Sequence, residues 1–420
     1  MEILEDLEFR GLIQQTTDAE NLSRRLKKSP VVLYCGFDAT GDSLHVGHLL
    51  PAICLKRFQL AGHKPIALIG GGTSLIGDPS GKTSERNLNP QEKVEEWSEK
   101  IKAQLASILE SDSAKNKVQI LTNYTWLGNL KMIDFIRDVG KHFSLGYMLA
   151  KESVKSRLES GISFTEFTYM LLQAYDFLKL HEDFNCELQI GGSDQWGNIT
   201  AGIDLIRKIT GKEVFGLTLP LIMKPDGTKF GKTESGAIWL DPKKTSPYQF
   251  YQFWINTNDK DVIKFLKYFT FLSKDEILKL AEEVKKNPEK REAQRILARE
   301  MTRIIHGEKS LSKAEKISRA LFYGELKNLS KEEIEEGFQD VPSYIIEKQR
   351  EIPLVELLVK SGASSSKRQA REGIKNGAIS VNGEIYKETD KILTPKNCFY
   401  NEYLIIRKGK KNYFLIRWQK

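Results

Sequence analysis

Two histidines stand three residues apart where a helix is predicted to begin. His45 and His48 share one face of the first turn of a helix expected over 44–61. The start of a helix offers free N–H groups and a partial positive charge, which suits a phosphate group. Gly47 lies between them without a side chain, so a flat base or ribose could pack against the backbone. By themselves the histidines also fit a metal pair, for which the sequence offers no third ligand nearby, or ordinary surface residues.

Two segments that contain glycine and lysine carry further phosphate-binding chemistry. Gly77–Thr83 and Gly227–Thr233 resemble the P-loop, which has four residues between its glycines, but each has three. The nest of backbone N–H groups that holds a phosphate depends on that count. Because the spacing differs, a P-loop phosphotransferase is kept only as the alternative hypothesis. Both segments remain candidates for binding phosphate in a different geometry.

A polar stripe crosses an otherwise apolar helix predicted over 165–180. Tyr169, Gln173 and Asp176 lie at positions i, i+4 and i+7, on one face of that helix. Polar groups among apolar neighbours must find polar partners or bear the cost of desolvation. A ligand with an ammonium group and a phenol would satisfy the stripe, and so would a purely structural buried network.

These motifs together resemble a known enzyme family. His45-Val-Gly-His48 resembles the His-Ile-Gly-His signature of class I aminoacyl-tRNA synthetases, and Lys229-Phe-Gly-Lys232-Thr233 resembles their Lys-Met-Ser-Lys-Ser loop. Within the second motif, Phe, Gly and Thr replace Met, Ser and Ser, and the Gly loses a hydroxyl group. The resemblance to bacterial-type tyrosyl-tRNA synthetases covers nearly the whole chain. Four further stretches carry it: Tyr34–Asp38, Gly77–Ser80, Tyr169–Asp176 and Gly191–Asn198.

The resemblance implies a reaction and a set of site residues. Tyrosine and ATP would give tyrosyl-adenylate and pyrophosphate, and tyrosine would then pass to the terminal ribose of tRNA(Tyr). ATP would enter with Mg²⁺ as substrate, without a protein metal site. The implied tyrosine-binding residues are Tyr34, Asp78, Tyr169, Gln173, Asp176 and Gln195. The implied catalytic residues are Thr40, His45, His48, Lys82, Arg86, Lys229, Lys232 and Thr233. The implied ATP-binding residues are Gly36, Asp38, Gly47, Gly192, Asp194 and Lys232.

The C-terminal part of the chain carries most of the excess positive charge. Residues 351–420 hold 14 basic and 7 acidic side chains, within a total net charge of +8. The predicted helix 365–376 places Lys367, Arg371 and Lys375 along one stripe beside Arg368, which suits RNA phosphates. A merely solvated face is the alternative. The segment resembles the RNA-binding domain named after ribosomal protein S-four. Weaker candidates for tRNA contacts are Lys151, Arg207 and Lys208.

The elements that must position these residues follow from hydrophobic patterning. Apolar strands predicted over 31–38 and 65–69 flank the helix 44–61, which indicates a parallel βαβ unit. Residues beyond about 259 are predicted to be helical. Three possible capping boxes lie there, in which serine precedes glutamate by three residues, at Ser273, Ser312 and Ser330. Two short helices at 353–361 and 365–376 and a terminal hairpin at 402–418 complete the pattern.

We therefore expect an α/β fold with three parts. A Rossmann-like catalytic domain over 1–228 precedes the Lys-containing loop and an α-helical domain over 229–338. A linker over 339–352 leads to a small α+β, S-four-like domain over 353–420. The family resemblance further implies a homodimer, with a helical insertion at about 125–165 as its interface.

The composition excludes several other classes of protein. Hydrophobic residues make up 40% and charged residues 29% of 420 residues, which is an ordinary globular mixture. No apolar run approaches the roughly 18 residues of a membrane span, and the acidic N-terminus does not resemble a secretory signal. Four scattered cysteines favour a reducing cytoplasm. An RNA-binding protein on an inactive synthetase scaffold remains a second alternative.

Overall fold

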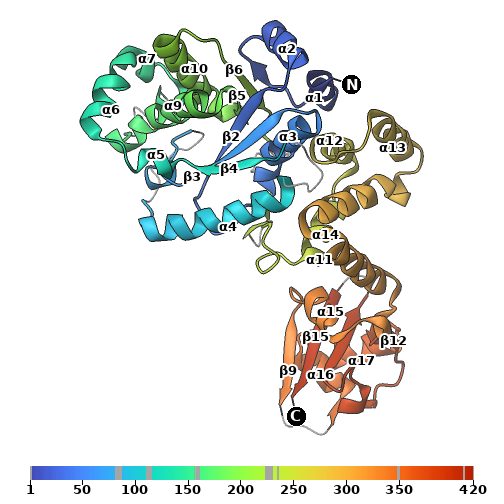
Figure 1. Cartoon of the computed structure of the whole chain (residues 1–420). Helices are drawn as coiled ribbons and strands as arrows, with labels where there is room; N and C mark the ends of the chain where they lie inside the picture. The colour runs from blue at the N-terminus through green and yellow to red at the C-terminus, as the bar shows by residue number, and fades with distance from the viewer. Residues whose placement is uncertain are drawn as a thin grey trace. The chain divides into compact units, whose positions relative to one another are not determined.

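The computed structural model describes most of the chain. The described residues are 2–80, 88–109, 116–155, 157, 161–222, 230–233, 236–347, 351–409 and 412–419, with the backbone alone for residues 152, 153, 232 and 233. The chain forms two compact units (Figure 1). The first comprises Met1–Thr245 and Thr257–Ile305, and the second comprises Ser246–Asn256 and His306–Lys420.

A six-stranded sheet of order β1-β6-β5-β2-β3-β4 forms the centre of the first unit. Its strands are β1 (Gln15–Thr16), β2 (Val32–Asp38), β3 (Lys64–Gly70), β4 (Gln119–Thr122), β5 (Cys186–Gly192) and β6 (Phe215–Leu219). All neighbours run parallel except β1, which is antiparallel to β6. The predicted βαβ unit is confirmed as β2, α3 (Leu49–Leu60) and β3. In such sheets ligands bind beyond the carboxyl ends of the strands.

Helices cover both faces of this sheet (Figure 1). The helices α9 (Phe164–Phe184) and α10 (Trp196–Thr210) pack on one face, and α3 and α4 (Gln91–Leu109) pack on the other. α3 is buried around most of its circumference, as expected of a helix that is apolar on all sides. The Ser163 hydroxyl accepts from the Glu166 N–H to begin α9, and Asn185 ends it in the left-handed conformation.

The insertion predicted at about 125–165 is helical in the structure. It contains α5 (Tyr124–Leu127), α6 (Met132–Asp138), α7 (Leu145–Leu149) and α8 (Glu152–Lys155). The remaining helices and strands of the first unit are α1 (Ile3–Arg10), α2 (Ala19–Lys28), β7 (Lys232–Thr233), β8 (Gly236–Ala237), α12 (Asp259–Phe269) and α13 (Lys274–Lys286).

The helical segment expected as one domain over 229–338 is divided between the two units. Residues 257–305 belong to the first unit, because the buried guanidinium groups of Arg10 and Arg57 donate to carbonyl groups at the end of α12. The following helix, α14 (Glu292–Tyr323), loses helical geometry at Gly307, where φ is 80° and ψ is 170°. The division between the units, after Ile305, lies next to this interruption.

A five-stranded sheet of order β12-β11-β14-β15-β9 forms the core of the second unit. Its strands are β9 (Ser343–Glu347), β11 (Ile379–Val381), β12 (Glu384–Ile385), β14 (Tyr403–Lys408) and β15 (Asn412–Gln419). The other elements are α11 (Pro247–Ile255), α15 (Lys331–Gly337), β10 (Ile352–Pro353), α16 (Leu354–Lys360), α17 (Lys367–Lys375) and β13 (Ile392–Leu393). The predicted helices at 353–361 and 365–376 and the hairpin at 402–418 are confirmed as α16, α17 and β14–β15.

The segment expected as a linker over 339–352 contains a strand instead. β9 pairs in parallel with β15, with Tyr344 opposite Ile416. Ile346 on the same strand is 2% exposed and packs into the core of the second unit. The strand forms because this apolar side chain gains burial against residues far along the chain, which no local pattern reveals.

Candidate active site

A buried carboxylate group lies at the carboxyl ends of the strands. Asp176 on α9 is 2% exposed and accepts hydrogen bonds from Asn123 Nδ2 at 2.9 Å and Trp126 Nε1 at 2.7 Å. Burial raises its pKa to about 7, against the opposing effect of these two donors. Asp176 is therefore poised between its charged and neutral forms near neutral pH.

A second buried group is left without a partner at the same place. The Tyr34 hydroxyl on β2 is fully buried and has no hydrogen-bond partner among the described residues. Burial raises the pKa of Tyr34 well above its usual value, and the charge of Asp176 adds to the effect. Buried hydroxyl groups are normally paired, so this one indicates a ligand that brings its own polar group between Tyr34 and Asp176.

A chain of hydrogen bonds joins Asp176 to the rest of the polar stripe. Asn123 Nδ2 also donates to Thr73 Oγ1 at 3.0 Å, and Thr73 Oγ1 donates to Asp38 Oδ1 at 2.8 Å. The Tyr169 hydroxyl donates to the other oxygen of Asp38 at 2.9 Å. The structural network that the sequence offered as an alternative is thus present, and it supports the groups around the unpaired Tyr34 hydroxyl.

A second carboxylate faces the other end of the stripe. Asp78 is 7% exposed and accepts from Gln195 Nε2 at 2.8 Å and from the Ser80 N–H at 2.9 Å. Burial raises the pKa of Tyr169, and the charges of Asp38 and Asp78 raise it further, which places both carboxylates near this phenol. Gln173 is half-buried on the same helix. Two carboxylates beside a neutral phenol suit an ammonium group.

The two histidines precede α3 instead of lying in the first turn of a helix over 44–61, because His45 caps a short 3-10 helix, Val46–His48, that leads into α3. His45 Nδ1 accepts from the Gly47 N–H at 3.0 Å, and His48 Nδ1 accepts from the His45 N–H at 3.2 Å. Because both Nδ1 atoms accept, the proton of each neutral ring lies on Nε2. Burial, and then the neighbouring His45, lower the pKa of His48 to about 3. Within the described part of the chain, no cluster of three or more His, Cys, Asp or Glu side chains could hold a metal ion.

The second signature lies against the first, although they are far apart in sequence. The Val46 N–H donates to the Ile238 carbonyl at 3.0 Å, and the Ile238 N–H donates to the Gly231 carbonyl at 2.8 Å. Gly231 has a φ of 83°, and a Cβ there would overlap Cγ2 of Val46. The family signature has serine at this position. Glycine replaces it here because Val46 leaves no room for a Cβ and because glycine adopts a positive φ without strain.

The phenylalanine that replaces methionine in the signature also has a packing reason. The Phe230 ring lies 4.8 Å from the Phe265 ring and 5.7 Å from the Phe269 ring, measured between centroids. Phe230 thereby anchors the segment to α12. Lys82, Arg86 and Lys229 lie outside the described residues, and Lys232 and Thr233 are described by their backbone in β7.

The predicted ATP-binding residues surround the same carboxyl edge. Gly36, Gly47 and the predicted catalytic Thr40 are exposed, and nothing lies within 4 Å of where a Cβ on Gly36 would be. A Cβ on Gly192 would lie 2.6 Å from Asp194 Oδ1, so glycine allows Asp194 to fold back at the start of α10. These glycines leave backbone open to a flat ligand.

The predicted tRNA contacts fall on two separate surfaces. On the first unit, Lys151 Nζ bonds Thr200 Oγ1 at 2.9 Å, Lys208 Nζ bonds the His142 carbonyl at 2.8 Å, and Arg207 pairs with Asp204. On the second unit, the basic stripe of α17 is exposed, while Ala370 and Ile374 on its other side are buried. No ion pair is formed, among the described residues, by Lys367, Arg368, Arg371 or Lys375.

Comparison with known proteins identifies the family. The model for tRNA synthetases class I (W and Y) matches residues 26–323. The chain belongs to this family. A second model, the tyrosine--tRNA ligase SYY-like C-terminal domain, matches residues 333–416. The fold class predicted from the sequence is confirmed by these matches and by the sheets described above.

Individual relatives of this class I synthetase cover its full length. Tyrosine--tRNA ligase of Geobacillus stearothermophilus is 60% identical over 419 residues, covering the whole of both chains. That of Desulfitobacterium hafniense is 60% identical over 422 residues, covering 99% of this chain and all of its own. Among solved structures, a C-terminally truncated Aspergillus nidulans mitochondrial tyrosyl-tRNA synthetase matches with a TM-score of 0.69 and 33% identity, covering 76% of this chain and 94% of its own.

The structure adds synthetase residues that sequence reasoning missed. Asn123, Trp126 and Thr73 hold Asp176 and Asp38 in place, yet none was singled out. Asn123 directly follows β4, and a polar residue just past a parallel strand is the sequence signal for such a role. The hydrophobic pattern does not predict β4, so this signal cannot be applied from the sequence.

Proposed function

We propose that this class I synthetase attaches tyrosine to tRNA(Tyr). The proposal of tyrosine as the substrate rests on the unpaired, buried Tyr34 hydroxyl beside Asp176, because the phenol group of a substrate would pair with both groups. The full-length relatives at 60% identity are named tyrosine--tRNA ligases. These matches favour the ligase over the P-loop phosphotransferase and over an RNA-binding protein on an inactive scaffold.

The first proposed step is the activation of tyrosine by ATP, which enters with Mg²⁺ as substrate. The tyrosine carboxylate is already ionised at neutral pH, so no general base is required. Its oxygen attacks the α-phosphorus of ATP, and the bond from that phosphorus to the β-phosphate oxygen breaks to release pyrophosphate. Catalysis then rests on positioning the two substrates and stabilising the charge that develops on the leaving group.

The residues of the site have separate roles in this step. The ammonium group of tyrosine is held by Asp78, Tyr169 and Gln173, with Gln195 fixing Asp78. The Nε2 protons of His45 and His48 are directed to the phosphate chain. Thr40, the cationic side chains of Lys82, Arg86, Lys229 and Lys232, and the hydroxyl group of Thr233 complete the donor set. Gly36, Asp38, Gly47, Gly192 and Asp194 hold the nucleotide.

The second proposed step transfers tyrosine to tRNA(Tyr). A hydroxyl group of the 3'-terminal ribose attacks the carbonyl carbon of the adenylate, and AMP leaves. We assign the acceptor arm to Lys151, Arg207 and Lys208 on the first unit, and another part of the tRNA to the basic stripe of α17. The exposed cations of α17, which form no ion pair among the described residues, suit a phosphate backbone, because binding releases its counterions.

We further propose a homodimer that forms through the helical insertion. Large apolar side chains are exposed on α6, α7 and the first residue of α9; they are Met132, Ile133, Ile136, Leu145 and Phe164. An exposed apolar patch of this kind marks an interface between proteins. Sedimentation velocity should show Ile133→Asp shifting the chain to a monomer, whereas Leu60→Asp, at an exposed apolar residue elsewhere, should not. Equal sedimentation of the two variants would refute this interface.

The described helices give no sign of a membrane protein, since none combines the length and apolar character needed to cross a bilayer. The four scattered cysteines are free thiols, which suits a reducing compartment. We therefore propose that the protein acts in the cytoplasm.

The decisive experiment is pyrophosphate exchange into ATP, run with each of the twenty amino acids. Exchange should depend on tyrosine alone among them. Exchange with phenylalanine at a similar rate would contradict the role of Tyr34 and Asp176, and ATP hydrolysis without any amino acid would favour the phosphotransferase.

A further inference from the structure

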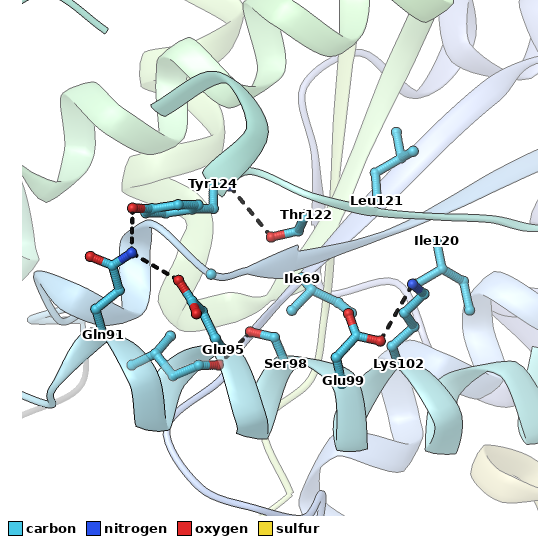
Figure 2. A pocket seen from close by; sticks show the side chains of 12 residues that line it. Ile69, Gln91, Glu95, Ser98, Glu99, Lys102, Ile120, Leu121, Thr122 and Tyr124 are labelled. Carbon is cyan, nitrogen blue, oxygen red and sulfur yellow. Dashed lines mark hydrogen bonds and ion pairs between the residues drawn. The ribbon is translucent and has the colours of Figure 1, made fainter. Parts of the chain in front are cut away.

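A cavity of about 240 Å³ lies away from the proposed active site, between α4 and the edge strand β4 (Figure 2). None of the residues assigned above to tyrosine, ATP or tRNA lines it. Thr122 and Tyr124 line this cavity, whereas Asn123 between them points to Asp176. The cavity therefore lies on the opposite side of this segment from the tyrosine site.

The two walls of the cavity differ in chemistry. The wall on the sheet side is apolar and is formed by the side chains of Ile69 and Ile120, whereas the Leu121 side chain packs on the other face of the sheet. The wall on the helix side is polar, because Glu95 and Ser98 face the cavity from successive turns of α4 (Figure 2). A ligand that fits both walls must have an apolar part and a polar head.

Hydrogen bonds close the two ends of the cavity and leave a carboxylate between them. At one end, Gln91 Nε2 donates to the Tyr124 hydroxyl at 2.6 Å and to Glu95 Oε1 at 2.8 Å. At the other end, Lys102 pairs with Glu99 at 3.5 Å. Within the described ranges, no cation pairs with Glu95.

The free acceptors beside Glu95 decide the charge of the ligand. Ser98 Oγ donates its proton to the Val94 carbonyl at 2.7 Å, which leaves its lone pairs to accept. Thr122 Oγ1 adds a further acceptor on the opposite wall. A carboxylate with neighbouring hydroxyl acceptors suits a group that is positively charged and only donates, which is the character of an ammonium ion. An anion would be repelled by Glu95 and Glu99.

We propose that this cavity binds a small primary aliphatic ammonium ion, with Glu95 as its counter-ion and its hydrocarbon chain on the Ile69 and Ile120 side chains. The inference is independent of the proposed function, because no residue of the active site takes part. A short unbranched chain suits the volume, which equals about eight water molecules at roughly 30 Å³ each.

The test uses n-butylammonium and the full chain saturated with tyrosine, so that the ammonium pocket of the active site is already filled. Methyl NMR signals of Ile69 and Ile120 should shift on titration, while those of Ile53, buried in α3, should stay fixed. Glu95→Gln should raise the dissociation constant by about fivefold or more, as expected for the loss of a charge-assisted hydrogen bond.

Two controls make the result specific. Glu96→Gln alters the next carboxylate of α4, which pairs with Lys100 and does not line the cavity, and it should leave the affinity unchanged. Neutral n-butanol should bind about fivefold more weakly than the amine. The proposal is overturned if the cavity methyl signals do not shift, if Glu95→Gln binds the amine as tightly as the parent chain, or if n-butanol binds equally well.

Discussion

The two ends of the proposed active site are built in different ways. At the phenol end, Asp176, Asn123 and Trp126 are held by side-chain hydrogen bonds within the core. At the phosphate end, the imidazoles of His45 and His48 are held by backbone N–H groups at the start of a helix. The first arrangement fixes which substrate fits, because burial penalises every unpaired group. The second fixes where donors point, so it should govern rate more than affinity.

The largest effect should come from removing the carboxylate of the phenol end. Asp176→Ala deletes the acceptor for the substrate phenol, removes the acceptor of Trp126 Nε1 and takes one of two acceptors from Asn123 Nδ2, at about 1–3 kcal/mol for each hydrogen bond lost. We expect kcat/KM for tyrosine-dependent exchange to fall by roughly 10³-fold, mostly through KM. Circular dichroism should show that the Asp176→Ala variant keeps its fold. Asp176→Asn should lower kcat/KM by a smaller factor. Unchanged kinetics would remove Asp176 from the site.

At the phosphate end the same comparison predicts a loss of rate. His45→Ala removes a donor aimed at the phosphate chain and should lower kcat by about 10²-fold, as for single donors to a transition state. The tyrosine dissociation constant, measured by equilibrium dialysis, should stay within twofold of the parent value. A large change in tyrosine affinity with an unchanged kcat would contradict the proposal that the phosphate end governs rate and the phenol end governs affinity.

Restoring the family residue at Gly231 should do harm rather than good. Gly231→Ser places a side chain at a φ of 83° and against Val46, which costs about 1–3 kcal/mol of strain. We expect kcat to fall about tenfold, with tyrosine affinity kept. Gly236→Ser, also at a positive φ but with nothing within 4 Å of its Cβ, serves as the control for strain without crowding. Equal activity of both variants would show that the contact with Val46 is unimportant.

The smallest effect concerns pH and reports on the phenol end alone. Because burial raises the pKa of Asp176 to about 7, and its ionised form accepts the phenol proton, tyrosine should bind about tenfold more tightly at pH 8 than at pH 6. Asn123→Ala removes a donor that lowers this pKa, so the profile should move to higher pH. Asn129→Ala, on the surface nearby, should leave the profile in place, and a flat profile for the parent would contradict the assignment.

The same raised pKa has a consequence for stability. Between about pH 4 and pH 7, the folded chain without tyrosine keeps a proton on Asp176. The unfolded chain has already lost this proton, because its Asp176 carboxyl group has the ordinary pKa of 3.8. The contribution of this group to the free energy of unfolding is therefore largest below about pH 4 and declines as pH rises toward 7.

Short-range features were predictable from the sequence where consecutive residues determine them. The capping boxes at Ser273 and Ser330 are present, because a serine and a glutamate three residues later satisfy the same backbone groups. The box predicted at Ser312 is wrong, since α14 runs through it. The same local pattern occurs there, but packing along α14 continues the helix.

The sequence by itself determined the family, the order of the signatures, the βαβ unit and the residue types of the proposed site, since each is carried by a short run of residues. Only the tertiary structure decided that Asn123 and Trp126 reach Asp176 across about 50 residues, and that Gly231 lies against Val46. It also decided that β9 joins a sheet. The physical reason is that pairing between distant segments depends on which surfaces become buried together, and this is a property of the whole packed core.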